Sequence, residues 1–252
     1  MRIPPKYMED IFRQEMLNRL TDAEAKRLFS LRTSQNIAAN DVVDMSSQSL
    51  DPIGLAIQKV LPSICTVWIK TAEDTWNGSG FLMTSKHIVT ASHVVEDIQG
   101  SAEIYVAFEE KEFVIAQVLK ADPNIDAAIL TLDQEISSVS PLQLCPKEEI
   151  MAGEEIAVIG SPEGWHDIVT VGRISALNKN LRASDDPSFQ DIILIDADIE
   201  AGSSGSAVIN VDGKVVGIVM ALIGTRAGTG IGQRAVSPAY KVQNLIQEVL
   251  NS

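Results

Sequence analysis

The sequence predicts an all-β protein, a barrel or a sandwich, with short helices at its ends. From Ile64 onward, short runs of β-branched and other apolar residues alternate with turns rich in Gly, Asp, Asn and Ser. This is the pattern of many short strands. Asp212-Gly213 separates two of these runs, SAVIN and KVVGIV, and is a strong hairpin signal. With 252 residues, 45% of them apolar, the chain can bury a sizeable core.

The segment before the strands has a different pattern. Residues 1–33 carry apolar side chains at helical spacing with a capping-box pattern midway, which predicts a helical hairpin. Residues 33–50 are polar and small and have the character of a linker. We therefore divide the chain into a helical extension with its linker, residues 1–50, and a main domain, residues 51–252.

Two helices are predicted at the ends of the main domain. Asp51-Pro52 places a capping residue before a proline at the first helical position, so a short helix should run to about Val60. The closing stretch, from Pro238 to Leu250, has apolar residues at helical spacing and predicts a C-terminal helix.

Charge and cysteine content restrict the function and the compartment. The chain has 20 basic and 34 acidic residues, a net charge of −14, which makes nucleic acid an unlikely partner. Its two cysteines, Cys65 and Cys145, lack metal-ligand spacing and suggest a reducing compartment, although a bridge between them is the alternative. No run approaches the ~18 apolar residues of a membrane span, and the N-terminus does not resemble a signal peptide. We expect a cytoplasmic protein without metal, cofactor or membrane.

Ser204 is the candidate nucleophile, in the stretch Gly202-Ser203-Ser204-Gly205-Ser206. A serine hydroxyl is a weak nucleophile at neutral pH, so it needs a base within hydrogen-bond reach and donors aimed at the developing oxyanion. Glycines on both sides let the backbone turn sharply, and the N–H groups of Gly202 and Ser204 are the natural pair of donors. Taken alone, the stretch is equally typical of a Gly/Ser loop between strands.

Candidates for the base and the orienting acid lie earlier in the chain. His93 follows a β-run and two small residues, whereas His87 has the setting of an exposed turn residue and His166 is the fallback base. Asp126 directly precedes an apolar strand, where a partly buried carboxylate can accept the second imidazole N–H and fix the tautomer. A turn aspartate is the alternative reading, and it suits Asp122 equally well.

The three residues follow one another in the order His93, Asp126, Ser204. This is the chain order of the chymotrypsin barrels and differs from that of α/β-hydrolases and subtilisins. The all-β pattern fits the same fold.

The region from about Ile53 to Leu250 resembles the protease domain of the HtrA (DegP/DegQ/DegS-type) serine proteases. GSGFLMTSKHIVTASHVV is similar to the family segment with the catalytic histidine, which implies that role for His93. ADPNIDAAILTL resembles the segment with the acid, at Asp126, and IDADIEAGSSGSAVINVDGKVVGI resembles the segment with the nucleophile, at Ser204. The resemblance implies a chymotrypsin-like double six-stranded β-barrel and a serine endopeptidase without a cofactor.

The sequence departs from that family in three respects. Ser206 and Ala207 stand where the family has Gly-Pro, no segment resembles its PDZ domain, and the helical extension replaces its signal peptide or anchor. We therefore do not carry over periplasmic quality control, PDZ-driven activation or cage assembly.

The leading hypothesis is a regulated cytoplasmic serine endopeptidase that acts on proteins or peptides through an acyl-enzyme. The alternatives are a catalytically silent protease-fold protein that binds partners, and an esterase, which the chain order and the all-β pattern disfavour. Residues 1–33 are expected to dock to an activating partner, to a second copy of the chain or onto the protease body.

Asp198 and Arg234 are the candidate specificity residues. Asp198 lies six residues before Ser204, where the resemblance to chymotrypsin-like enzymes places the floor of the pocket for the side chain preceding the cut. A buried carboxylate there would favour Lys or Arg, but pairing with Arg234 would consume its charge. HtrA-type enzymes prefer small aliphatic side chains, so we expect that preference, with basic side chains as the alternative.

Overall fold

The computed structural model describes most of the main domain. The described residues are 51–71, 74–96, 98, 102–108, 112–161, 168–180, 186–200, 202–223 and 233–250. The predicted helical hairpin and linker, and the fallback base His166, lie outside the described residues.

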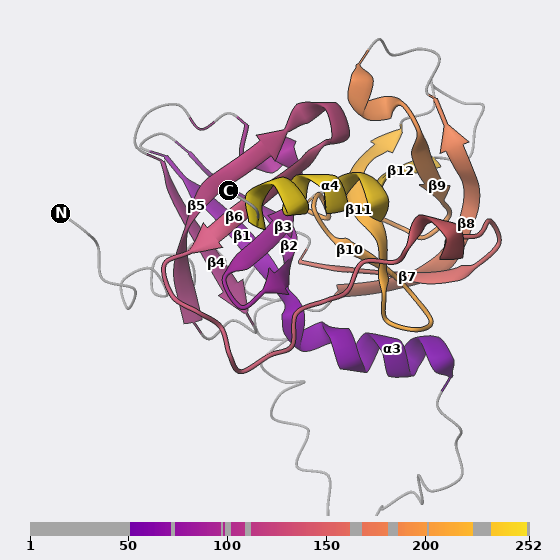
Figure 1. Cartoon of the computed structure of the whole chain (residues 1–252), viewed down its shortest axis with the longest axis horizontal. Coiled ribbons are helices and arrows are strands. Elements are labelled where there is room, and N and C mark those ends of the chain that lie inside the picture. The colour runs from indigo at the N-terminus through magenta and orange to yellow at the C-terminus, as the bar shows by residue number, and fades with distance from the viewer. Residues whose placement is uncertain are drawn as a thin grey trace, which may run out of the picture. The chain divides into compact units, whose positions relative to one another are not determined.

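The first barrel closes in the order β1–β2–β3–β6–β5–β4, and all its pairs are antiparallel. Figure 1 shows its six strands grouped on the left. Side chains of a strand point alternately to its two faces, so Cys65, Val67 and Ile69 all face the interior of this barrel. Its strands are β1 (Ile64–Lys70), β2 (Thr75–Thr84), β3 (His87–Thr90), β4 (Glu103–Phe108), β5 (Glu112–Asp122) and β6 (Ala127–Leu132).

The second barrel closes in the order β10–β11–β12–β9–β8–β7. The hairpin predicted at Asp212-Gly213 joins β10 to β11, and Gly213 has a φ of +76°. The Asn210 side chain supports this turn by accepting the N–H groups of Asp212 and Lys214 at 3.1 and 3.0 Å. The strands are β7 (Glu155–Gly160), β8 (Ile168–Lys179), β9 (Ile192–Ile195), β10 (Ala207–Asn210), β11 (Val215–Ile223) and β12 (Gln233–Pro238).

Helices flank the barrels as the sequence predicts. Helix α3 (Pro52–Val60) begins with its proline in the first turn, and α4 (Ala239–Leu250) packs against strands of both barrels (Figure 1). No helix in the described part of the chain is long and apolar enough to cross a membrane. The short 3-10 helices are η2 (Leu61–Ser63), η3 (Ser92–Val94), η4 (Pro123–Ile125), η5 (Lys147–Glu149) and η7 (Pro187–Phe189).

An apolar core joins the two barrels to each other. Buried side chains from the first barrel, such as Phe81 and Val89, form one cluster with Ile159 and Ile218 of the second barrel and with Val242 of α4. Burial of this area favours docking of the barrels. The predicted double six-stranded barrel with a C-terminal helix is therefore confirmed.

Candidate active site

His93 and Asp126 are brought together by two neighbouring strands. His93 lies in η3, which follows β3, and Asp126 lies between η4 and β6. Strands β3 and β6 are paired, with Thr90 opposite Ala128. The two residues, 33 positions apart, thus meet at the same edge of the first barrel.

The Asp126 carboxylate is buried and fully engaged with η3. His93 Nδ1 lies 2.9 Å from both carboxylate oxygens, and the His93 backbone N–H donates to Oδ1 at 3.1 Å. The Ser92 hydroxyl, itself buried, donates to the same oxygen at 3.0 Å. Because an ionised carboxylate only accepts hydrogen bonds, Nδ1 carries the proton and Nε2 is left as the basic nitrogen.

The electrostatic setting of His93 favours its protonated form. The hydrogen bond that His93 donates to Asp126 raises the pKa of His93, partial burial opposes this, and the negative charges of Asp126 and Glu96 raise the pKa further. The ring is still accessible, with 42% of the side chain exposed, so a substrate can reach it.

The nucleophile loop, residues 202–206, is a tight turn in which Ser203, Gly205 and Ser206 donate their backbone N–H groups. Gly202 has a φ of +87°, and the Ser203 N–H donates to Glu200 O at 3.0 Å. The N–H groups of Gly205 and Ser206 also have acceptors, Val219 O and Ser203 O, each at 2.9 Å. Within the described residues, the N–H groups of Gly202 and Ser204 donate to no acceptor.

Ser204 lies beside the turn that carries His93. A Cβ placed on Gly78 would come within 2.8 Å of the Val94 methyl groups and within 3.1 Å of Ser204 O. The segment that carries His93 and the loop that carries Ser204 therefore both pack against the backbone of Gly78. In the described part of the chain, no hydrogen bond joins the Ser204 hydroxyl to the His93 ring. Such bonds often form only when substrate is bound.

Ser203 is a poorer nucleophile candidate than Ser204. Its hydroxyl accepts the Glu200 N–H at 3.1 Å and its residue is buried, whereas Ser204 is half-buried. Asp122 is a turn aspartate: it accepts the Asn124 N–H at 2.9 Å and caps η4. His87 is half-buried and its Nδ1 lies 2.7 Å from the Thr84 hydroxyl.

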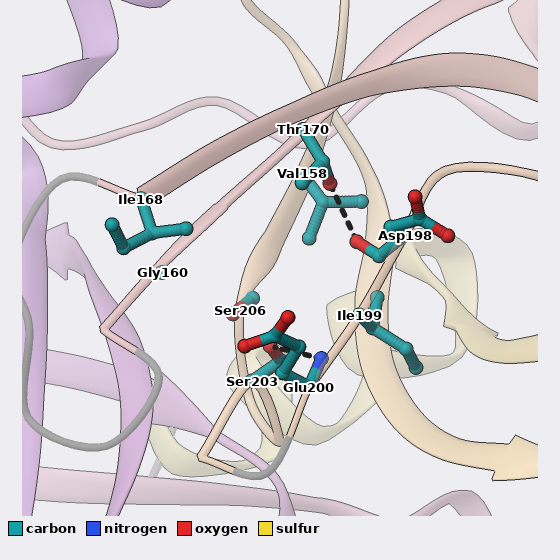
Figure 2. Close-up of a pocket in the computed structure, with 9 residues that line it drawn as sticks. All are labelled: Val158, Gly160, Ile168, Thr170, Asp198, Ile199, Glu200, Ser203 and Ser206. Carbon is teal, nitrogen blue, oxygen red and sulfur yellow. Dashed lines mark hydrogen bonds between the residues drawn. The ribbon is translucent and has the colours of Figure 1, made fainter.

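A small pocket adjoins the nucleophile loop (Figure 2). Its volume is about 90 Å³, and Ser203 and Ser206 form the wall next to Ser204. A Cβ on Gly160 would overlap the Ser206 hydroxyl, so the Ser206 side chain packs directly against the backbone of Gly160. The lining residues are Val158, Gly160, Ile168, Thr170, Asp198, Ile199, Glu200, Ser203 and Ser206.

Asp198 lines this pocket, but its carboxylate is paired elsewhere. Its carbonyl accepts the Thr170 hydroxyl at 2.6 Å, and Figure 2 shows its carboxylate pointing away from Ser203 and Ser206. The carboxylate pairs with Arg234, and the Asp198 side chain is 79% exposed while that of Arg234 is 17% exposed. The premise for a basic preference, a buried carboxylate on the pocket floor, is therefore not met.

Comparisons with known proteins identify the family of this chain. Residues 78–218 match the family described as "Trypsin-like peptidase domain". That is more than half of the chain, and the chain therefore belongs to the trypsin-like serine protease family.

Within that family, its relatives are HtrA-type proteases. The chain is 31% identical to a probable periplasmic serine endoprotease DegP-like of Chlamydia pneumoniae over 71% of its length. It is 33% identical to a protein of the same name from Halomonas elongata over 69%. It covers 35% of each of these relatives. A solved structure, "HtrA-type protease AlgW with tripeptide", superimposes with a TM-score of 0.66 at 27% identity, over 77% of this chain and 62% of that one.

The expectation of a cytoplasmic location is wrong. Relatives are named periplasmic serine endoproteases, which points to the periplasm. The expectation rested in part on Cys65 and Cys145, which are both free and buried, one in the interior of each barrel. Burial raises the pKa of Cys65, and burial together with nearby carboxylates raises that of Cys145 to about 11. Such thiols are unreactive and do not report the redox compartment.

Proposed function

We propose that this chain is a serine endopeptidase that cleaves peptide bonds through a triad of His93, Asp126 and Ser204. The hydrogen-bonded His93–Asp126 pair is the observation that carries this proposal. It holds the imidazole in the tautomer whose Nε2 can take a proton from a serine hydroxyl. The open N–H groups of Gly202 and Ser204 support it as candidate oxyanion donors.

The chemistry proceeds in two halves. Ser204 Oγ attacks the scissile carbonyl carbon while His93 Nε2 takes the hydroxyl proton, and the N–H groups of Gly202 and Ser204 stabilise the oxyanion. The C–N bond breaks, the amine leaves with the proton from His93, and an acyl-enzyme remains. A water molecule deprotonated by His93 then attacks the ester, which releases the acid product and restores Ser204.

Labelling by a fluorophosphonate probe, together with digestion of a peptide library, tests this function. The wild type should be labelled and active, and Ser204→Ala and His93→Ala should fall to near background because the two groups act as a unit. Asp126→Asn should lower kcat by about 10⁴-fold, since it favours the wrong tautomer. Full activity in Ser204→Ala would contradict the assignment, and an unlabelled wild type would instead favour a silent protease-fold protein.

We further propose that the pocket beside Ser204 takes a small aliphatic side chain from the residue preceding the cut. A volume of about 90 Å³ is well below the roughly 300–1,000 Å³ of pockets for drug-sized ligands, and the Asp198 charge is paired with Arg234. The same library decides between the alternatives. Cleavage after Val, Ala or Thr that survives Asp198→Ala supports a small pocket, whereas cleavage after Lys or Arg that Asp198→Ala abolishes contradicts it.

The relatives' names also suggest where the protein works. We propose that it acts on protein or peptide substrates in the periplasm, as the names of the DegP-like relatives indicate for those proteins. Fractionation of cells that produce the native protein tests this location, and recovery with cytoplasmic markers would contradict it.

A further inference from the structure

Ser79, a fully buried residue of β2, has every polar atom engaged. Its N–H donates to Ser204 O at 2.8 Å, and its carbonyl accepts the Thr90 hydroxyl at 2.7 Å. Its hydroxyl donates to Gly202 O at 2.8 Å and accepts the Ser161 N–H at 2.8 Å. Three of these four bonds cross from the first barrel to the second. Ser79 thus links β2 of the first barrel, the barrel that carries His93, to the loop of the second barrel that carries the candidate nucleophile.

Gly78 allows the close approach of β2 to the nucleophile loop, and Gly80 allows its close approach to β3. A Cβ on Gly78 would be 3.1 Å from Ser204 O, and one on Gly80 would be 2.9 Å from Val89 O. Both distances are shorter than ordinary van der Waals contact, so only glycine fits without a shift. The GSG sequence therefore places a hydroxyl against the nucleophile loop.

The bonds of Ser79 fix the peptide groups around the two open donors. The peptide between Gly202 and Ser203 is held at its carbonyl by the Ser79 hydroxyl and at its N–H by Glu200 O. The peptide that follows Ser204 is held at its carbonyl by the Ser79 N–H and at its own N–H by Val219 O. Since each peptide is planar, holding both ends fixes its orientation. The Gly202 and Ser204 N–H groups lie on the peptides adjacent to these.

We propose that Ser79 is a positioning residue for the oxyanion hole: its hydroxyl holds the Gly202 carbonyl so that the Gly202 and Ser204 N–H groups converge on the substrate oxygen. This inference rests on the proposed serine endopeptidase function and adds a residue to it. An oxyanion hole stabilises charge that exists only in the transition state. Loss of the Ser79 hydroxyl should therefore act on kcat and leave KM nearly unchanged.

The test compares Ser79→Ala with wild type and with Ser63→Ala. Ser79→Ala removes the hydroxyl bonds to Gly202 and Ser161 but keeps the backbone bond to Ser204 O. Ser63 is a matched control: it is also buried and donates to Ser140 O at 2.6 Å, outside the site. All variants are assayed below their melting temperatures with the best peptide substrate, and their affinity for a peptidyl boronic acid is measured.

We expect Ser79→Ala to lower kcat by about 10- to 100-fold, less than the roughly 10²–10³-fold loss on removing an oxyanion donor itself. Boronate affinity should fall by a similar factor and KM should change little. Ser63→Ala should lower the melting temperature without this kcat loss. If Ser79→Ala does not fold, Ser79→Cys, which keeps volume but offers only a weak hydrogen-bonding group, should show the same kcat loss.

The outcomes distinguish the role of Ser79 from the endopeptidase function. An active wild type with unchanged kcat in Ser79→Ala, or in Ser79→Cys where only that variant folds, would overturn the role of Ser79 and leave the endopeptidase proposal intact. An effect on KM alone would also overturn it. A wild type that neither cleaves nor is labelled by a fluorophosphonate would overturn the endopeptidase proposal itself, and the role of Ser79 with it.

Discussion

Asp126 shows how one backbone conformation sets the position of a candidate catalytic group. Its φ of +48° lies in the left-handed region, which aspartate tolerates better than most residues. The conformation turns the chain from η4 into β6 and leaves the carboxylate buried beneath η3. Three donors from Ser92 and His93 offset the cost of burying that charge. The strained residue thus lies where the chemistry requires a fixed acceptor.

The ionisation of His93 leads to a first prediction, on pH. The active base is the neutral ring, and the hydrogen bond that it donates to Asp126, together with the charge of Glu96, raises its pKa above the ordinary value of about 6.5. Activity, measured as kcat/KM, should therefore rise with pH through a midpoint above about 6.5. Glu96→Gln removes one of the charges that raise the pKa and should lower the midpoint. A rate that is flat from acid to neutral pH would exclude a histidine base.

Ser92 leads to a second prediction, about the acid. Its hydroxyl donates to Asp126 Oδ1 at 3.0 Å, so Ser92→Ala leaves a buried carboxylate with one donor fewer. The carboxylate then interacts more strongly with His93, and the kcat/KM midpoint should move to higher pH. We expect kcat to fall by about tenfold, which corresponds to an increase of about 1.4 kcal/mol in the activation free energy. A Ser92→Ala profile that coincides with wild type would show that Ser92 only packs there.

At the scale of elements, the end of β7 depends on close packing against the nucleophile loop. Gly160 is the last residue of β7, and an added Cβ would overlap the Ser206 hydroxyl and lie 2.7 Å from the Ser79 hydroxyl. Gly160→Ala should destabilise the fold by about 1–3 kcal/mol. A thermal melt measures this, with about 2–4 °C expected per kcal/mol for a chain of this size.

Two further variants make that prediction specific. Ser206→Gly in the Gly160→Ala background removes the overlapping hydroxyl and should recover part of the lost stability. Gly54, within α3, has open space around its Cα, so Gly54→Ala should stabilise by about 0.5–1 kcal/mol. If Gly160→Ala melted at the wild-type temperature, β7 and the loop would have to move apart easily.

The elements were predictable because their signals lie in short stretches of sequence. The triad candidates were predictable because several short motifs follow one another in the chain order of the resembling family. The runs of apolar residues give the strands, Asp51-Pro52 gives α3, and Asp212-Gly213 gives a hairpin. The roles of Ser92 and Ser79 were not predictable. Their partners lie far away in the sequence, Asp126 34 residues on and Gly202 123 residues on. Nothing in a short serine-containing motif specifies such a distant acceptor.

At the scale of the whole molecule, the two barrels act as one unit because their interface is both apolar and polar. Phe81 and Ile159 belong to one core cluster that spans the two barrels. Beside it, the Ser237 hydroxyl of β12 donates to Ile125 O at 2.6 Å, next to Asp126. Asn77 of β2 donates to Ser161 O at 3.1 Å, next to the Ser79 bond. Each barrel therefore supports the candidate catalytic segment of the other.

The last prediction concerns how much of the chain the protease fold needs. Both barrels and α4 lie within residues 51–252, and α3 buries Ile53, Ala56 and Val60 in the shared core. We propose that residues 51–252 fold alone and keep the activity of the full chain, so removal of residues 1–50 should leave kcat/KM and the melting temperature nearly unchanged. Removal up to Leu61 also deletes α3.

That longer deletion should destabilise the protein by about 3–6 kcal/mol, at about 1.5–3 kcal/mol for each of the large buried side chains Ile53 and Val60. Thermal melts and peptidase assays of both truncated chains measure the difference, and sedimentation shows whether residues 1–50 set the oligomeric state. An unfolded chain of residues 51–252 would place the extension in the core of the fold, because the protease domain would then be incomplete without it.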